Sequence, residues 1–244
     1  MTRMTMVQAL NLALTQEMEK DDSVIVLGED ASESERWAAG ELQHWLRETG
    51  APELPILSPA DATGRPAIVV GWNPRSAELL ALPARPEPAD ESFVYRSSGA
   101  DIAICGGAER GTMYGVLTFL EREFGARWYT PRVSAVPKRN AWTFRVLRHR
   151  EAPGIRVRND FYFEAFEPVW AARNKVNGAM GYREQPGGVE SYWAVHTFYP
   201  LMPPAEFYEE HPEYYSLING ERIHDHAQLC LTNPDVLNII TERL

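Results

Sequence analysis

Cysteine is scarce in this sequence, and long hydrophobic runs are missing. The 244 residues include two cysteines, Cys105 and Cys230, which cannot form a disulfide framework and have no nearby Cys or His at zinc spacing. No run approaches the roughly 18–20 apolar residues of a membrane-spanning helix. Residues 1–14 are too polar for a signal peptide and lack a small-residue cleavage site, so the sequence as written predicts a chain that is not exported.

Positive charge is also in short supply. Lys and Arg number 24 against 34 Asp and Glu, which gives a formal net charge of −10. The electrostatic field of this negative net charge repels phosphate backbones and anionic lipids, so we expect neither nucleic acid nor a membrane surface as a partner. Hydrophobic residues at 44% and charged residues at 24% are typical of a folded globular chain, which at this length forms one large domain or two small ones.

The first 150 residues predict a small sheet with helices packed on it. Apolar runs of strand length alternate with segments of helical periodicity, and Ser98-Gly99-Ala100 joins two of the runs as in a hairpin. This mixture predicts an α/β fold. The expected strands are 23–27, 67–71, 93–97, 101–105, 127–130 and 142–147; the expected helices are 5–19, a segment from the capping box of Ser32 and Glu35 to Gly50, and 109–124 before Gly125.

The composition changes at Glu151, where aromatic residues become frequent and polar side chains follow short apolar runs. This change indicates a second domain, at 151–244. The Asn219-Gly220 pair is a hairpin signal, and Asn233 followed by Pro234 is typical of a helix N-terminus. The expected strands are 155–157, 176–180 and 228–231, and the expected helices are 165–174, 203–208 and the segment after Asn233.

A family resemblance lies within residues 38–131. The segments that carry it are AAGELQHWLRETGAPELPI, AIVVG and ICGGAERGTMYGVLTFLEREFGARWYTP, of which RGTMYGVLTFLE is the most specific. They resemble the small N-terminal domain of the family 67 α-glucuronidases, which also occurs in family 20 hexosaminidases. The resemblance implies that residues 23–147 form this α/β domain and that a (β/α)8 barrel follows it.

The downstream sequence resembles a bacterial group of glycoside-hydrolase-like proteins that couple this domain to a barrel. The matching segments are VWAARNKVNGAM, HPEYYSLINGERI and QLCLTNPDV, and the resemblance covers about residues 23–244. It implies barrel strands at 151–163, 175–180 and 228–231, so that residues 151–244 are the first three β/α units of a truncated TIM barrel. Ligands are then expected at the carboxyl ends of these strands.

The first 30 residues resemble a different family. The segment MTMVQALNLALTQEMEKDDSVIVLGED is similar to the start of the β-subunit of bacterial 2-oxoacid dehydrogenases, which indicates a fusion, whether natural, engineered or from a faulty gene model. The part SVIVLGED also suits the first strand of the glycosidase-like domain. The thiamine-contacting glutamate of the dehydrogenase family lies beyond the matched segment, so thiamine chemistry is not expected here.

Arg158, Asn159 and Asp160 follow the first expected barrel strand. Arg158 stands where family 20 enzymes have an arginine that holds sugar hydroxyls, so the resemblance implies a substrate-binding role. A salt bridge to Asp160 or Glu164 is the alternative for Arg158. Asn159 and Asp160 are expected at the same barrel mouth, although an Asn-Asp pair after a strand is also typical of a turn.

Three further residues complete the predicted substrate-binding set. Asn177 matches the asparagine of a K-x-N pattern, where the amide either reaches substrate or, as we favour, ties strand to loop. His196 and Tyr199 lie in an aromatic stretch with Trp193 and Phe198. Rings beside hydrogen-bonding groups suit a pyranose, but such a cluster is also common in a protein core.

Metal and cofactor chemistry are not expected. The triplet at 224–226, His-Asp-His, lacks helical spacing and a clear third ligand. Gly106-Gly107 with Arg110-Gly111 lacks the spacing of a P-loop or dinucleotide motif, and close packing of strand and helix is the favoured interpretation. Cys230 is expected as a small core residue on a buried strand.

The sequence therefore predicts the N-terminal part of a carbohydrate-active enzyme, a glycoside hydrolase on uronic-acid or amino-sugar glycans. In the resembled families the catalytic carboxylates come from the fourth barrel strand onward, so we nominate none of Glu164, Glu167 or Glu184 and expect this chain alone to be inactive. The alternatives are a non-catalytic carbohydrate-binding or interaction module and an assembly fragment related to the oxoacid dehydrogenase. The glycan, the retaining or inverting outcome, the oligomeric state and the native compartment stay open.

Overall fold

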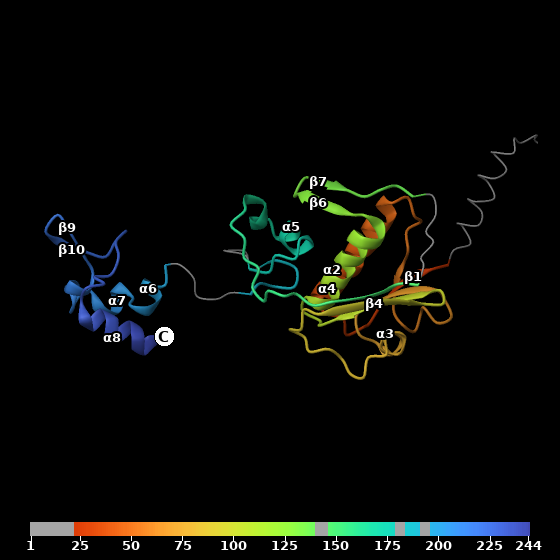
Figure 1. Cartoon of the computed structure of the whole chain (residues 1–244), viewed down its shortest axis with the longest axis horizontal. Coiled ribbons are helices and arrows are strands. Elements are labelled where there is room, and N and C mark those ends of the chain that lie inside the picture. The colour runs from red at the N-terminus through yellow and green to blue at the C-terminus, as the bar shows by residue number, and fades with distance from the viewer. Residues whose placement is uncertain (1–21, 140–145, 179–183, 191–195) are drawn as a thin grey trace, which may run out of the picture. The chain divides into compact units, whose positions relative to one another are not determined.

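The computed structural model describes residues 22–139, 146–178, 184–190 and 196–244 (Figure 1). Contacts divide the chain into two compact units, one ending at Ser191 and one beginning at Tyr192. The sequence predicts a boundary near residue 150 instead, and that division stays a prediction. The expected helix at 5–19 lies outside the described residues.

A six-stranded sheet forms the centre of the first unit. Its order is β2-β1-β3-β5-β4-β8, in which the first four strands are parallel and β4 pairs antiparallel with both of its neighbours. This mixed, mostly parallel sheet confirms the α/β class. The strands are β1 (Val24–Leu27), β2 (Ile56–Leu57), β3 (Ala67–Val70), β4 (Phe93–Ser98), β5 (Asp101–Gly106) and β8 (Arg148–Glu151).

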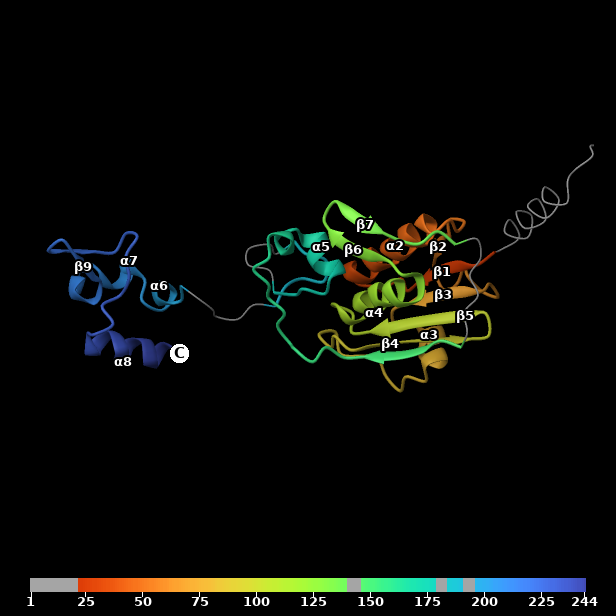
Figure 2. The same ribbon diagram turned by 45° about the horizontal axis from the view of Figure 1, so that its top comes forward.

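Helices cover both faces of this sheet (Figure 2). On one face lie α2 (Glu33–Glu48) and α4 (Gly111–Phe119), and α4 continues as a π-helical turn, η1 (Leu120–Phe124). The short α3 (Pro74–Leu80) covers the other face. The larger core lies under α2 and α4, and a smaller core lies under α3; they include Leu42, Leu46, Val116, Leu117 and Phe119 in the first, and Val24, Val26, Leu80 and Cys105 in the second.

Local signals explain where the main helices begin and end. Ser32 accepts a hydrogen bond from the backbone N–H of Glu35, and the Glu35 side chain accepts one from the Ser32 N–H, so the predicted capping box is confirmed. Gly50 and Gly125 follow α2 and η1 with φ of 103° and 76°, in the left-handed region where glycine lacks the Cβ penalty.

One strand of this unit, β8 (Arg148–Glu151), is not among the predicted ones. The expected strand at 142–147 falls largely outside the described residues, and the strand beside β4 is β8, with the sequence Arg-His-Arg-Glu. Because β8 is at the sheet edge and has no apolar alternation, hydrophobic pattern alone did not reveal it. The hairpin of β4 and β5 is confirmed, and β6 (Arg127–Thr130) pairs with a further strand, β7 (Val133–Ala135).

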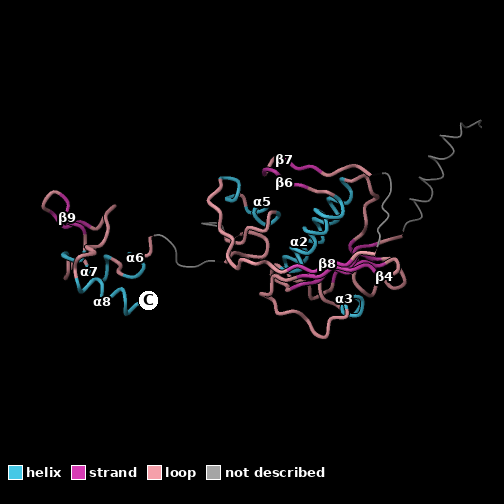
Figure 3. Tube along the Cα trace, in the orientation of Figure 1, coloured by secondary structure: helices cyan, strands magenta, loops and turns pink. Residues whose placement is uncertain are grey.

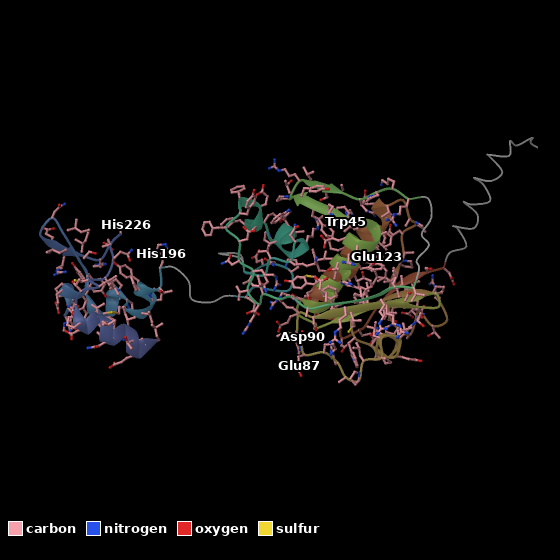
Figure 4. The ribbon with its side chains drawn as sticks, in the orientation of Figure 1. Trp45, Glu87, Asp90, Glu123, His196 and His226 are labelled. Atoms are coloured by element: carbon pink, nitrogen blue, oxygen red, sulfur yellow. The ribbon has the colours of Figure 1, made fainter. Side chains whose placement is uncertain are left out.

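Three glycines let the loop at 87–92 lie directly over the start of α4. A Cβ on Gly107 would lie 2.2 Å from the Asp90 carbonyl oxygen, and one on Gly106 would lie 2.6 Å from the carbonyl carbon of Gly111. The Gly107 N–H donates to the Asp90 carbonyl at 3.0 Å. Figure 4 shows Glu87 and Asp90 on this loop. The favoured interpretation of the glycines, close packing of strand and helix, is therefore confirmed.

Residues 152–190 do not form the expected barrel strands where the structure describes them. They contain a 3-10 turn, η2 (Phe163–Phe166), and α5 (Pro168–Arg173), which partly match the helix predicted at 165–174. The strand expected at 155–157 is absent, and 176–178 is not in a strand. The physical reason is that backbone groups here form hydrogen bonds to side chains or within turns. For example, the Arg158 N–H donates to Asn177 Oδ1 at 2.7 Å.

The second unit is small, and aromatic residues form much of its core. Figure 3 shows its short helices and its hairpin. Its hairpin turns at Asn219-Gly220, with φ of 53° and 87°, and its last helix is capped by Asn233, as predicted. The strand expected at 228–231 is reduced to one bridge between Tyr215 and Leu229, and Cys230 is half-buried with its thiol near the Thr232 hydroxyl. The elements are α6 (Phe198–Leu201), α7 (Pro204–Phe207), η3 (Pro212–Tyr214), β9 (Ser216–Ile218), β10 (Glu221–Ile223) and α8 (Pro234–Arg243).

The substitution Gly107→Ala tests the close approach of the 87–92 loop. Its methyl group would overlap the carbonyl oxygens of Asp90 and Glu87, so we expect the free energy of unfolding to fall by about 2–3 kcal/mol. The matched control is Gly40→Ala in the middle of α2, where nothing lies within 4 Å of the added Cβ, and a gain of about 0.5–1 kcal/mol is expected. Urea denaturation measures both, and equal effects would contradict the packing argument.

Candidate functional site

A partly buried ion cluster centred on Glu91 joins three segments of the first unit. Glu91 lies just before β4, and its side chain is 11% exposed. Its Oε1 accepts hydrogen bonds from Arg110 Nε and Asn177 Nδ2, both at 2.7 Å, and its Oε2 pairs with Arg158 Nη1 at 2.7 Å. We call these four residues the Glu91 cluster. One carboxylate thus holds the start of α4 and the segments around 158 and 177.

Arg110 extends this cluster to a fourth segment. It is the arginine of the RGTMYG motif, and its side chain is 4% exposed. Its Nη1 donates to the Gly187 carbonyl at 3.0 Å, and its Nη2 donates to Glu190 Oε1 at 2.6 Å. A Cβ on Gly187 would lie 2.6 Å from Arg110 Cγ, so the glycine permits this contact.

The guanidinium of Arg158 is bonded to other groups of the first unit. Besides Glu91, it donates to the carbonyls of Lys175 and Ile155, each at 2.7 Å, and to the Tyr114 hydroxyl at 3.2 Å. Its Cζ lies 5.4 Å from the centre of the Tyr114 ring. The salt bridge thus forms with a residue distant in sequence rather than with the Asp160 or Glu164 considered from the sequence, and these contacts fix the backbone of the segment.

Asn177 also bonds to the segment around Arg158. It is fully buried, its Oδ1 accepts the Arg158 N–H, and its Nδ2 also donates to the Arg156 carbonyl at 2.8 Å. The Gly178 N–H donates to the Arg158 carbonyl at 3.1 Å. The amide of Asn177 therefore ties the two segments together, and its polar atoms are occupied by protein partners.

The residues that follow Arg158 are exposed. Asn159 and Asp160 lie at the surface, and Asp160 Oδ1 accepts the Tyr162 N–H at 2.7 Å, as in an Asx turn. The next three side chains, of Phe161, Tyr162 and Phe163, are 73%, 66% and 87% exposed. We call residues 159–163 the aromatic segment. Rings of this size are seldom exposed in succession, which marks the segment as a candidate binding surface.

His196 and Tyr199 belong to the second unit. The Tyr199 hydroxyl donates to the His224 carbonyl at 2.7 Å, and its ring contacts the ring of Tyr215 edge-on at 6.0 Å. His196 is exposed and has a positive φ of 63°. Of the six predicted site residues, the structure therefore brings together Arg158, Asn159, Asp160 and Asn177 within the first unit.

A hollow of about 300 Å³ lies over the charged side of the Glu91 cluster. Asp90, Glu91, Arg110, Arg156 and Glu190 contribute its polar lining. Arg156 is half of a weaker pair, with its Nη2 3.8 Å from Glu190 Oε2. Because Arg110 is already paired with two carboxylates, the hollow contains no uncompensated charge from that residue.

The charges of the cluster stabilise each other. Burial alone raises the pKa of the Glu91 carboxyl, but hydrogen bonds from Arg158, Asn177 and Arg110 and the charge of Arg158 together lower it below its ordinary value. Although burial opposes it, the same contacts raise the pKa of both arginines. The cluster is thus an ionised network at neutral pH, and we assign it a positioning role.

From the sequence, no ion pair was assigned to Arg110, to Glu91 or to Glu190, which pairs with Arg110. Arg110 lies in RGTMYGVLTFLE, the most specific motif of the chain. That motif was the feature of the sequence from which its importance could have been inferred. Glu91 and Glu190 carry no local signal, because each pairs with residues tens of positions away. Among the described residues, no group of three or more His, Cys, Asp or Glu is placed to hold a metal ion. None of the helices in the described ranges is long and apolar enough to cross a bilayer.

The first unit is thus an α/β protein unit with a fixed internal ion cluster and an exposed aromatic segment. Residues 128–244 match a family model described as a domain of unknown function, DUF4838. No curated protein matches the chain. Among solved structures, part of the chain is similar to a GH138 enzyme targeting pectin rhamnogalacturonan II, with 18% sequence identity and a TM-score of 0.29. The match covers 41% of this chain and 10% of that enzyme.

The substitution Glu91→Gln tests the ion cluster. It removes the carboxylate that pairs with the half-buried Arg158 and leaves the buried Arg110 with Glu190 as its close counter-charge, so we expect the free energy of unfolding at neutral pH to fall by about 2–4 kcal/mol. Because the folded pKa of Glu91 is lowered, its stabilising contribution is present above the unfolded pKa, near 4.5, and is lost as the pH falls through the folded pKa. The stability of the variant should therefore fall less between about pH 5 and pH 2 than that of the unchanged protein.

Chemical denaturation across this pH range measures the effect. Glu53→Gln is the matched control, since Glu53 is 59% exposed and lies 3.6 Å from Arg47 at the surface. We expect this control to change the free energy of unfolding by less than about 0.5 kcal/mol. Parallel pH curves for the unchanged protein and Glu91→Gln would overturn the argument.

Proposed function

We propose that this chain is a carbohydrate-binding part of a glycoside-hydrolase-like protein and that it contacts the glycan through the aromatic segment. The observation that carries the proposal is the exposure of three consecutive rings beside Asn159 and Asp160. Ring faces pack against the C–H faces of a pyranose, while an amide and a carboxylate bond to its hydroxyls. The segment thus combines the two kinds of contact that sugars require.

The Glu91 cluster supports this proposal by fixing the base of the segment. Arg158 is held through both its side chain and its backbone N–H, so Asn159 and the residues after it start from a defined position. A binding segment that is ordered before the ligand arrives loses less conformational entropy on binding. Arg158 and Asn177 are therefore assigned as positioning residues, and Asn159 and Asp160 as contact residues.

The family resemblance supplies the rest of the proposal. The RGTMYGVLTFLE segment resembles the accessory domain of family 67 and family 20 glycosidases, and it forms the helix that packs on the sheet. Uronic-acid and amino-sugar glycans are the proposed ligand classes on that ground. His196 and Tyr199 are proposed as further contacts on the second unit, and the chain alone is proposed to bind glycan without hydrolysing it.

The substitutions Phe161→Ala and Tyr162→Ala test the proposed surface. Because each ring is mostly exposed, we expect each change to weaken glycan binding by about tenfold or more while leaving the free energy of unfolding within about 0.5 kcal/mol. A glycan array identifies the ligand, and calorimetric titration measures the affinity. Tyr129→Ala is the matched control, since Tyr129 is 62% exposed on β6, and it should leave binding unchanged.

Two results would contradict the proposal in part. Glycan binding that is unaffected by both aromatic substitutions would remove the aromatic segment from the site. Release of the aryl group from aryl glucuronides or aryl hexosaminides by the pure chain would show that the chain is itself a catalyst. Absence of binding to every glycan on the array would reject the carbohydrate role altogether.

A further inference from the structure

Three arginines lie near the edge of the central sheet, on the face that α3 covers. β8 is the edge strand and β4 is its inner neighbour (Figure 3). Val94 of β4 packs against the smaller core under α3, so Arg96, two residues further on, points to the same face. Arg148 lies opposite Arg96 and Arg150 lies opposite Val94, and directly opposite residues share a face. We call Arg96, Arg148 and Arg150 the arginine patch.

The arginine patch has no counter-charge of its own. All three residues are exposed, and none of their side chains forms a hydrogen bond or an ion pair within the described chain. Asp101 points to the same face from β5, but its carboxylate bonds to Arg75 Nε at 3.1 Å and to Arg75 Nη2 at 2.7 Å. Glu78, the acidic residue of α3, forms no ion pair with the patch. Residues 140–145, which precede β8 and are not described, include no Asp or Glu.

The carboxylate of β8 itself belongs to the opposite face of the sheet. Glu151 Oε2 lies 3.0 Å from His149 Nε2, and the His149 ring lies 5.1 Å from the ring of the buried Tyr95. Tyr95 is part of the core under α2 and α4, so His149 and Glu151 lie on that side. The patch is therefore a positive surface in a chain whose net charge is −10.

The strand register places like charges side by side in this patch. The Cβ atoms of directly opposite residues are about 4.5–5.5 Å apart, and like charges at such positions destabilise the pairing. Charge on an edge strand discourages pairing with another sheet, which accounts for Arg148 and Arg150. It does not account for Arg96, which lies on the inner strand directly opposite Arg148. An anion bound between Arg96 and Arg148 would remove their repulsion.

From these observations we propose that the arginine patch binds a polysaccharide chain that carries carboxylate or sulfate groups. The inference rests on the proposed carbohydrate role and adds to it a second contact surface and the sign of the ligand's charge. Each guanidinium is a planar fork of donors that bonds to two oxygens of an acid group. Ser98, exposed on the same face, supplies a hydroxyl for those of the sugar. Nucleic acid fits less well, because its dense phosphate charge meets the negative field of the remaining chain.

The experiment is calorimetric titration of the full chain with four oligomers at about 20 mM salt. The probes are a hexamer of galacturonic acid, the same hexamer fully methyl-esterified, a sulfated glucan hexamer, and a hexamer of thymidylate. We expect one or both of the anionic hexasaccharides to bind about tenfold or more tightly than the methyl ester and the thymidylate. Comparison of the two anionic probes identifies the acid group. Salt at about 200 mM should weaken their binding by about tenfold, because it screens exposed charges.

Charge-removing variants locate the site. Arg96→Gln combined with Arg148→Gln should lower the affinity for the preferred anionic hexasaccharide by about tenfold. The charge-matched control combines Arg36→Gln on α2 with Arg132→Gln between β6 and β7, both exposed, and should change this affinity by less than about twofold. Because the patch substitutions remove a like-charge pair, they should leave the Tm at low salt unchanged or raise it. A lower Tm would show that the arginines stabilise the fold and would overturn the inference.

The outcomes separate this inference from the proposed function. Equal binding of the anionic and methyl-esterified hexamers, or an unchanged affinity of the folded double variant, would overturn the inference alone. Thymidylate binding as tightly as the anionic sugars, with the same loss in the double variant, would assign the patch to nucleic acid instead. Phe161→Ala should weaken the charged and the esterified hexamers by the same factor, so that the preference for charge is kept. Failure of every glycan to bind would reject the carbohydrate role on which the inference rests.

Discussion

The first unit depends on one carboxylate, that of Glu91, which pairs with the buried Arg110 and with the half-buried Arg158. Glu91 receives hydrogen bonds from Arg110, Asn177 and Arg158, which come from parts of the chain far apart in sequence. Removing one partner from such a pair leaves an unpaired buried charge, which is costly, so the three segments are coupled. The cluster therefore holds the start of α4 and the segments around residues 158 and 177 together as one corner of the unit.

This corner forms because glycine allows the backbone of the Glu91 loop to approach closely. Gly106, Gly107 and Gly111 leave room for the carbonyl oxygens of Asp90 and Ser92, where side chains would collide. The loop then places Glu91 within reach of Arg110 at the start of α4. The motif that carries the family resemblance is thus explained by packing: its arginine supplies a charge, and its glycines supply space.

The same corner supports the proposed binding surface. Through Arg158 it fixes the base of the aromatic segment, and through Arg110 it holds the backbone at Gly187. This role does not require the cluster to touch a ligand. Residues that resemble a ligand-binding set in sequence can thus act by holding the exposed residues beside them in position, as Arg158 and Asn177 do for Asn159 and Asp160.

The sequence by itself determined the elements that are stabilised by interactions between residues close together in the chain. The capping box at Ser32, the glycine after α2 and the turn at Asn219-Gly220 were all predictable, because each depends on residues within a few positions of each other. The buried strands of the sheet were also predictable from apolar runs. Tertiary structure alone decided that Glu91 pairs with Arg158, that the described residues 155–157 form no strand, and that three rings are exposed. These features depend on partners brought together by folding and leave no periodic signal in the chain.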